Sequence, residues 1–412
     1  MKSGDITLRR HLVSVPADFP LQYSPSIDAG LVQRARDLGP RIAAGALETE
    51  RDRRLPESTV GALTEAGLFK LTAPRRYGGH QANFATFLAV HAEMARACGS
   101  TAWVSTITNI CNWTVGTASE RIREDVFGAD PDARVCGVIA PSGTAVPTGD
   151  GYSVTGSWGF ASGSLHATWA LVGVKVTDGS GQVTGFGNIV IPMDQITVKD
   201  TWHVAGMRGT GSNTLVVENV FVPAHRYTPL SFGADQPDNH PDEPLYRSAL
   251  VPALALVLAG PQLGLARAAL DHTLATIGKH GLSYTFYEEA TKAPSTQFQV
   301  AQAAELIDTA ALHVFRSATH IDQAAAEGRH LDVTERLRVR MDTGYAVTRV
   351  REAIELLLDA NGASSFAESN PLQRIWRDSS TAARHAIASP GISTEAYGRA
   401  LLGIEEQMTP IV

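Results

Sequence analysis

Hydrophobic residues recur every three or four positions through the first third of the chain. The first series of this kind, which predicts a helix over residues 27–55, consists of Ile27, Leu31, Ala35, Leu38 and Ile42. Further helices are predicted over residues 56–67, 84–97 and 101–116. The last of these segments lacks charged residues, so we expect it to be buried on all sides.

The period of the pattern changes at Asp130-Pro131-Asp132. Beyond it, short runs of apolar residues alternate with polar ones between glycine-rich turns, which is typical of β-strands. The predicted strands cover residues 134–139, 152–160, 168–176, 188–191 and 214–222. Because no helical pattern intervenes, the sequence favours a compact antiparallel barrel or sandwich and argues against parallel β-α-β units.

Helical spacing returns after Tyr246. The residues 250–266 are uncharged but contain Pro252, Gly260 and Pro261, so we interpret them as a buried helix and not as a membrane span. Two longer seams follow, and they are formed by Leu263, Ala266, Leu270, Leu274 and Ile277, and by Val300, Ala304, Ile307, Ala311, Val314, Ala318, Ile321 and Ala325. A third runs through Val347, Val350, Ile354 and Leu357. These narrow, alanine-rich seams predict a helical bundle that packs against copies of itself.

The patterns together predict an α+β multidomain protein. We divide it into an N-terminal arm (1–25), an N-terminal helical domain (26–130), a central β domain (131–235) and a C-terminal helical bundle that also serves oligomerisation (236–412). A proline-rich acidic connector at residues 235–244 closes the β domain.

Composition excludes several classes of function. The net charge of −7 and the lack of a Lys/Arg-rich run argue against a nucleic-acid partner. The first 25 residues mix charged with apolar residues and so do not form a secretory signal. The three cysteines lack a C-x-x-C pattern, which argues against disulfides and zinc and fits a reducing cytoplasm. No metal site and no membrane partner are expected.

The stretch from Tyr152 to Trp169 carries the most informative chemistry. Its alternation places Trp158 and Phe160 on one face of a strand, and the strand runs into the turn Ala161-Ser162-Gly163-Ser164. Aromatic walls beside hydroxyl and amide groups suit a flat, partly polar ring system. The simpler interpretation is a strand with core aromatics and a serine-rich turn.

The glycine cluster Gly206-Met-Arg-Gly-Thr-Gly-Ser212 is a second candidate. It precedes a predicted strand instead of joining a strand to a helix, so it does not fit the dinucleotide-binding fingerprint. Its amides, the guanidinium of Arg208 and the hydroxyls of Thr210 and Ser212 suit a phosphate or a ring carbonyl, although a plain β-turn with an exposed arginine would have the same sequence. Motifs of serine hydrolases, phosphate-binding loops and zinc proteases are missing from the sequence.

Several motifs together resemble the acyl-CoA dehydrogenase superfamily over nearly the whole chain. They include Trp158-x-Phe160-x-Ser162-Gly163, the Gly206–Ser212 cluster, Gln297-Phe-Gln299 and Trp376-Arg-Asp378. More narrowly, residues 138–144, 162–169 and 396–403 resemble the two-component monooxygenases that depend on reduced flavin. The resemblance implies a helical, β, helical fold and a homotetramer.

This resemblance implies a set of cofactor contacts. Reduced FMN or FAD, supplied by a separate flavin reductase, would react with O2 and form a C4a-hydroperoxide. The hydroperoxide would then transfer one oxygen atom to a small-molecule substrate. Trp158, Phe160, Ser162 and Ser164 would flank the isoalloxazine, with Ser162 near N5. The edge or tail of the flavin would be held by Arg208, Thr210 and Ser212, and, across a subunit boundary, by Gln297, Asn361 and Gly362.

The expected catalytic base departs from the dehydrogenase pattern. Dehydrogenases of this superfamily often carry a carboxylate soon after the Arg-Asp motif, whereas residues 379–394 contain no acidic residue and instead contain His385. We therefore expect His385 to act as acid or base and Ser162 to assist catalysis. A histidine that packs or caps in the last helix is the alternative.

The motif Cys111-Asn112-Trp113 is expected to line the substrate pocket. The phenol hydroxylases that it resembles have a histidine where this chain has Cys111, and a thiol is the poorer base at neutral pH. Hydroxylation of a small aromatic or polyketide-type substrate is the preferred function. N-oxygenation of an amine or amino sugar, acyl-CoA dehydrogenation, and a non-catalytic flavin-fold scaffold remain as alternatives.

Overall fold

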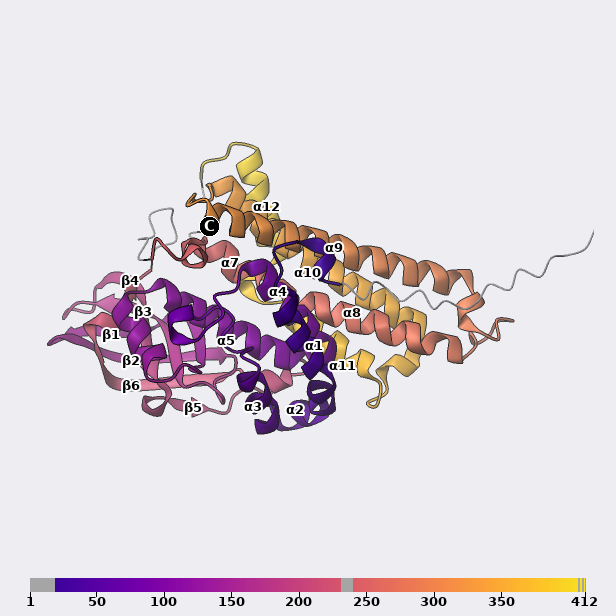
Figure 1. Cartoon of the computed structure of the whole chain (residues 1–412), viewed down its shortest axis with the longest axis horizontal. Helices are drawn as coiled ribbons and strands as arrows, with labels where there is room; N and C mark the ends of the chain where they lie inside the picture. The colour runs from indigo at the N-terminus through magenta and orange to yellow at the C-terminus, as the bar shows by residue number, and fades with distance from the viewer. Residues whose placement is uncertain (1–18, 231–239, 407, 410, 412) are drawn as a thin grey trace, which may run out of the picture.

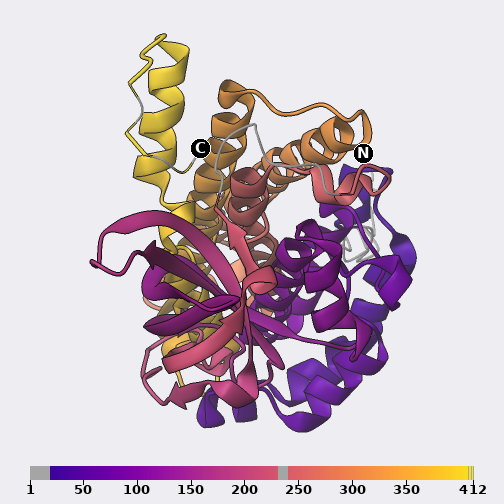
Figure 2. The same cartoon turned by 90° about the vertical axis from the view of Figure 1, so that its left-hand side faces the viewer.

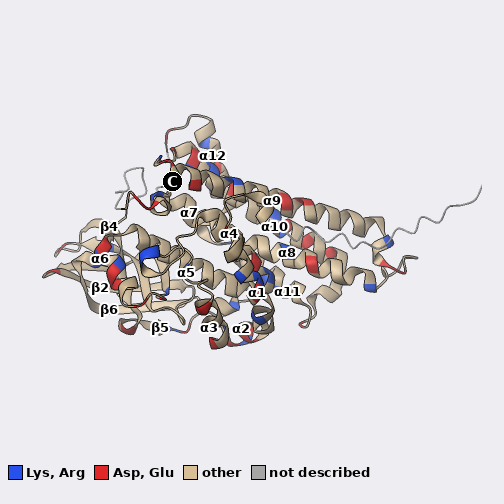
Figure 3. Ribbon diagram, viewed as in Figure 1, with Lys and Arg blue, Asp and Glu red and all other residues tan. Residues whose placement is uncertain are grey.

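The computed structural model describes residues 19–230, 240–406, 408, 409 and 411. Most of the N-terminal arm and residues 231–239, which include the first half of the connector at 235–244, lie outside the described residues. A β-sheet occupies one end of the molecule and long helices extend to the other, with helix α5 (Gly99–Thr117) between them (Figure 1). Basic and acidic residues are interspersed along the helices (Figure 3).

The N-terminal part is helical, as expected. Its helices are α1 (Ala29–Ala44), α2 (Ala46–Asp52), α3 (Glu57–Glu65), α4 (Phe84–Ala97), α5 (Gly99–Thr117) and α6 (Glu120–Arg123). The predicted helix over 27–55 is divided into α1 and α2 at Gly45, because glycine is a poor helix former. The expected burial of α5 is confirmed, since nearly all of its residues are buried.

The central strands form one seven-stranded sheet. The strands are β1 (Val135–Thr148), β2 (Gly151–Ala161), β3 (Trp169–Thr177), β4 (Val183–Pro192), β5 (Thr197–Lys199), β6 (Asn213–Pro223) and β7 (Tyr227–Pro229), in the order β5-β6-β2-β1-β3-β4-β7. The expectation of a purely antiparallel domain is wrong in one respect, because β1 and β3 pair in parallel. Strand β2 follows β1 directly and pairs with it along one edge in the antiparallel direction. Strand β3 pairs along the second edge of β1. The N-terminal helices lie along one side of the sheet (Figure 2).

The C-terminal part is a helical bundle. It consists of α7 (Leu250–Leu256), α8 (Ala259–Thr276), α9 (Pro294–Ala326), α10 (Val333–Asn361), α11 (Pro371–Ala382) and α12 (Pro390–Leu401). Most of the predicted α9 seam is buried, from Ile307 to Ala325. The segment Leu250–Lys279 is long and apolar enough to cross a membrane, but 89% of its most apolar window is buried inside the protein. It is therefore the core helix of the bundle, in which α8 packs against α4 and α10.

Candidate functional site

The register of the sheet brings the two predicted loops together. Strands β2 and β6 are antiparallel neighbours, and Ala161 pairs with Asn213, so the turn after β2 lies beside the loop before β6. Gly163 donates its backbone N–H to Thr210 O over 2.9 Å, and the Ser164 hydroxyl donates to Gly211 O over 3.1 Å. Sequence reasoning named both loops, and the sheet explains why they meet.

Three hydroxyl groups connect these loops in a continuous chain. Ser162 Oγ lies 2.8 Å from Ser212 Oγ, and Ser212 Oγ lies 2.7 Å from Thr210 Oγ1. Thr210 Oγ1 in turn donates to Met207 O over 2.8 Å. All three side chains are buried, so their hydrogen bonds are made within the protein.

Trp103 links this chain of hydroxyl groups to His385, the predicted acid or base. Its indole N–H donates to Ser162 Oγ over 3.2 Å, and its ring centroid lies 6.1 Å from that of His385. His385 follows α11 and is exposed at its outer side, and partial desolvation by the surrounding protein lowers the pKa of its imidazole below the usual range. An imidazole in this state is neutral at pH 7 and is able to accept a proton there.

Phe160 is the aromatic residue that faces outward beside Ser162. Its side chain is 76% exposed, and its ring meets that of Trp202 edge-on at 5.8 Å. Its backbone has φ +65°, a left-handed conformation that costs a residue with a side chain about 1–2 kcal/mol. Strain of this kind is typical of functional sites, and here it turns the ring out of the sheet.

The expectation that Trp158 shares a face with Phe160 is wrong. Trp158 is 0% exposed, and its indole N–H donates to Gly173 O over 2.7 Å inside the sheet. The two-residue alternation fails because the pairing of β2 with β6 shifts register between Trp158 and Ala161. Trp158 therefore packs in the sheet core and offers no open wall to a ligand.

The loop before β6 is held from the side of the bundle by α11. The carboxylate of Asp378 accepts the backbone N–H of Met207 over 2.5 Å. Asp378 is buried, and burial, opposed by this hydrogen bond, raises its pKa to about 6. Arg208, a predicted flavin contact, donates to the backbone carbonyls of Glu50 and Val204, so it braces the loop against α2.

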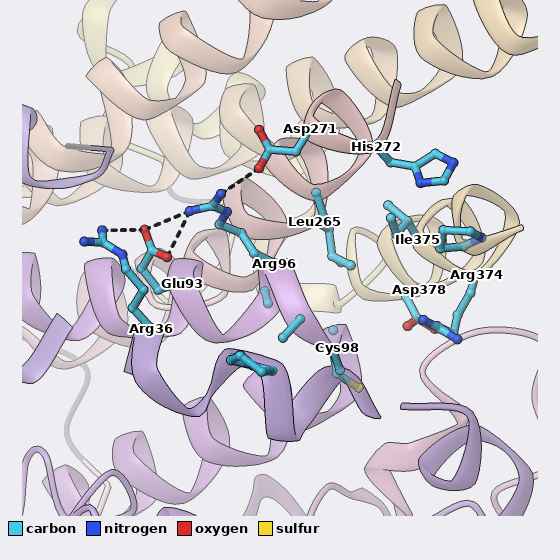
Figure 4. Close-up of a pocket in the computed structure, with 18 residues that line it drawn as sticks. Arg36, Glu93, Arg96, Cys98, Leu265, Asp271, His272, Arg374, Ile375 and Asp378 are labelled. Atoms are coloured by element: carbon cyan, nitrogen blue, oxygen red, sulfur yellow. Dashed lines mark hydrogen bonds and ion pairs between the residues drawn. The ribbon is translucent and has the colours of Figure 1, made fainter. Parts of the chain in front are cut away.

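A cavity of about 540 Å³, with Asp378 in its lining, lies between α1, α4, α8 and α11. One wall carries a chain of ion pairs that runs from Arg36 through Glu93 and Arg96 to Asp271 (Figure 4). Ser162, Phe160 and His385 do not line this cavity. Asp378 is the residue by which the cavity meets the loop before β6.

The structure contradicts the prediction that Asn112 and Trp113 line a substrate pocket. Both are 0% exposed, and their side chains donate to backbone carbonyls, Asn112 to Phe69 O and Trp113 to Leu245 O, each over 2.9 Å. Cys111 is buried too, and burial raises the pKa of its thiol. The three residues fall on the faces of α5 that pack into the core.

Helix α9 begins, and helix α10 ends, at the end of the bundle opposite the sheet (Figure 1). Gln297 belongs to the start of α9, and Asn361 and Gly362 to the end of α10. The Gln297 amide donates to Thr291 O over 2.9 Å, and the Asn361 amide donates to Thr273 Oγ1 over 2.9 Å. Gly362 adopts φ +66° where α10 ends. Within one chain these residues do not join the site.

Two residues that connect parts of the candidate site are not evident from the sequence. Trp103 joins Ser162 to His385, but in the sequence it is one apolar residue among many in α5. Asp378 was recognised only as part of a motif, and the Trp-Arg-Asp sequence was the available signal for its role. Neither contact follows from local spacing, because each joins segments more than 50 residues apart.

The site residues fit a flavin ring. The exposed ring of Phe160 provides an apolar surface. Ser162, at the end of the chain of buried hydroxyls, provides a hydrogen-bond partner, and the neutral imidazole of His385 provides a proton acceptor. The left-handed backbone at Phe160, which turns the ring outward next to Ser162, is the structural observation that supports this fit.

Comparison with known proteins places the chain in one family. Residues 31–126 match the family model "Acyl-CoA dehydrogenase, N-terminal domain", and residues 256–390 match "Acyl-CoA dehydrogenase, C-terminal domain". The oxygenase subunit HsaA of a flavin-dependent monooxygenase from Rhodococcus jostii (strain RHA1) is 35% identical and covers 90% of this chain and 98% of its own.

Two further relatives extend the comparison. The oxygenase component of an FADH(2)-dependent resorcinol hydroxylase from Rhizobium sp. (strain MTP-10005) is 32% identical over 94% of this chain and 97% of its own. The solved structure of XiaF from Streptomyces sp., in complex with FADH2 and glycerol, has a TM-score of 0.89 at 38% identity and covers 93% of this chain and 96% of its own. This chain therefore belongs to the acyl-CoA dehydrogenase superfamily, in the branch that contains the oxygenase components of two-component flavin-dependent monooxygenases.

Proposed function

We propose that this protein is the oxygenase component of a two-component flavin-dependent monooxygenase that hydroxylates a small aromatic or polyketide-type substrate. The observation that carries this proposal is that Trp103 contacts both Ser162 and His385, while the exposed ring of Phe160 lies two residues before Ser162 in the chain. The relatives from Rhodococcus jostii and Rhizobium sp. are an oxygenase subunit and an oxygenase component, and resorcinol is an aromatic substrate. A separate reductase component would supply the reduced flavin.

The side chains have distinct roles in this proposal. Bound reduced flavin would supply the electrons that activate O2. Phe160, with Trp202 behind it, offers an apolar surface that excludes water from one side of the site. Ser162 offers a hydrogen-bond partner at its Oγ, and an imidazole nitrogen of His385 would take a proton from the substrate hydroxyl. Names of relatives that specify FADH2 favour FAD over FMN.

The residues present do not support acyl-CoA dehydrogenation. That reaction needs a carboxylate base near the flavin, and residues 379–394, where many dehydrogenases carry it, contain no acidic residue. The nearest acid on α11, Asp378, uses its carboxylate on Met207 N–H. His385 occupies the corresponding region.

We further propose a homotetramer in the cytoplasm. Tyr284 and Phe286 are fully exposed in the described chain, in the segment that leads from α8 to α9 at the end of the bundle opposite the sheet (Figure 1). Exposed aromatic side chains mark contact surfaces, so this end would meet another subunit and bring Gln297, Asn361 and Gly362 to its flavin. The three cysteines are free thiols, as expected in a reducing compartment. Light scattering on the purified protein tests the tetramer.

The function is tested with purified protein, chemically reduced FAD or FMN, and ¹⁸O2. We expect one labelled oxygen atom in the product of a phenolic or polyketide substrate, measured by mass spectrometry. Label in an amine substrate instead would show N-oxygenation. Reduction of bound flavin by an acyl-CoA would show a dehydrogenase, and release of all oxygen as hydrogen peroxide with every substrate class would contradict the proposal.

A further inference from the structure

The hydroxyl chain that ends at Ser162 has a fixed direction. A hydroxyl group donates one hydrogen bond and accepts up to two. Thr210 uses its single proton on Met207 O, because a carbonyl oxygen 2.8 Å away is able only to accept. In the contact between Thr210 and Ser212 the donor must then be Ser212.

The same count continues to Ser162. Ser212 has spent its proton on Thr210, so in the 2.8 Å contact between the two serines Ser162 is the donor. Ser162 Oγ also accepts the indole N–H of Trp103. One acceptor position is left on Ser162 Oγ, and no proton is left to give. Toward a ligand, Ser162 is therefore an acceptor only.

The carbonyl group of Met207, at which the chain of hydroxyl hydrogen bonds ends, is itself held in place. Met207 has φ +56°, its N–H is bound by Asp378, and its carbonyl oxygen also accepts the indole N–H of Trp202 over 2.9 Å. A carbonyl held in this way does not turn from Thr210 without breaking several buried contacts. The chain therefore keeps its direction when a ligand arrives.

We infer that Thr210 and Ser212 determine which redox state of a flavin this site prefers, through the proton that they withdraw from Ser162. The inference rests on the proposed function, because it takes Ser162 to face N5 of the flavin ring. The N5 atom carries hydrogen in the reduced ring and donates to Ser162, whereas in the oxidised ring N5 is an acceptor. Thr210 and Ser212 are thus positioning residues that favour the reduced flavin.

The size of the preference follows from one hydrogen bond. With an oxidised ring, N5 and Ser162 Oγ would face each other as two acceptors with no proton between them. Alternatively, Ser162 would turn its proton to N5, and its hydrogen bond to Ser212 would be lost. Loss of one net hydrogen bond in a buried setting weakens binding roughly tenfold. A tenfold preference for the reduced form raises the two-electron reduction potential of bound flavin by about 30 mV.

The test measures the dissociation constants of reduced and oxidised FAD by anaerobic titration. In Ser212→Ala the proton of Ser162 is free, and in Thr210→Val the proton of Ser212 is free to return to Ser162, so Ser162 becomes able to donate in both. We expect the ratio of the oxidised to the reduced dissociation constant to fall roughly tenfold in each variant. Thr210→Ser keeps the hydroxyl and should restore the wild-type ratio.

Ser164→Ala is the matched control, because Ser164 lies in the same turn but donates to Gly211 O outside the chain of hydroxyls. A loop that is merely loosened would weaken both redox forms together and leave the ratio unchanged. An unchanged ratio in Ser212→Ala and Thr210→Val would overturn the inference. A wild-type protein that binds neither form would contradict the proposed function instead.

Discussion

The carboxylate of Asp378 accepts the backbone N–H of Met207 over 2.5 Å, and this contact joins α11 to the loop that precedes β6. The same helix leads directly to His385. One helix of the bundle therefore positions both the loop that fixes the Ser162 hydroxyl and the candidate acid or base. Changes in this contact should be measurable far from it.

Asp378 should make stability depend on pH in an unusual direction. Burial raises its pKa to about 6 from an ordinary value near 3.8, so the folded protein holds this proton more tightly than the unfolded chain. The stabilising effect of the proton is complete below about pH 4 and is lost as the pH rises to about 6. Relative to Asp378→Asn, which has no such proton, wild type should lose about 2–3 kcal/mol across this window.

Urea unfolding of both proteins at pH 4.5 and pH 7.5 measures this difference. Protonatable groups elsewhere affect the two proteins equally, so only the gap between them is informative. A gap that stays constant with pH would show that the Met207 N–H and the neighbouring arginines keep the carboxylate ionised throughout.

Trp103→Phe should distinguish the contribution of the indole N–H from that of the aromatic ring. Phenylalanine keeps a ring beside His385 but removes the donor to Ser162, which costs about 0.5–1.5 kcal/mol of stability. We expect Ser162 to lose its fixed orientation, so less product and more hydrogen peroxide should form per O2 consumed. Trp113→Phe is the control: it removes a similar hydrogen bond, to Leu245 O in the core, and should lower the melting temperature without changing this ratio.

His385→Ala should reduce product formation while flavin still binds. General acid or base groups contribute about 10²–10⁴-fold to rate, so we expect a loss of at least about 10²-fold in kcat. Because burial lowers the pKa of His385, wild-type kcat should fall with pH only below about 6.5, as the imidazole gains a proton, and this inflection should vanish in His385→Asn. His272→Ala serves as the control, since burial also lowers the pKa of His272 but it lines the cavity shown in Figure 4. An equal loss in both variants would contradict a role for His385.

The sequence predicted the order of helical and β parts and the two loops of the site, because both depend on local patterns. It failed where tertiary contacts decide. Strict alternation put Trp158 beside Phe160, but one left-handed residue reverses the side on which a ring lies. The motif around Cys111 was assigned to a pocket, and only helix packing shows that Asn112 and Trp113 face the core. Trp103 gains its position from a contact across 59 residues, which no local pattern encodes.

Gly206→Ala should disrupt the site by displacing the loop before β6 from α11. A Cβ atom at Gly206 would lie 2.1 Å from the backbone carbonyl oxygen of Arg377, so either the loop or α11 has to move. Overpacking of this kind costs about 1–3 kcal/mol and would pull Met207 away from Asp378. We expect a lower melting temperature together with weaker binding of reduced flavin. Gly179→Ala, at a turn where a Cβ meets nothing within 4 Å, should change neither quantity. If Gly206→Ala binds flavin as tightly as wild type, the contact between α11 and this loop does not control the site.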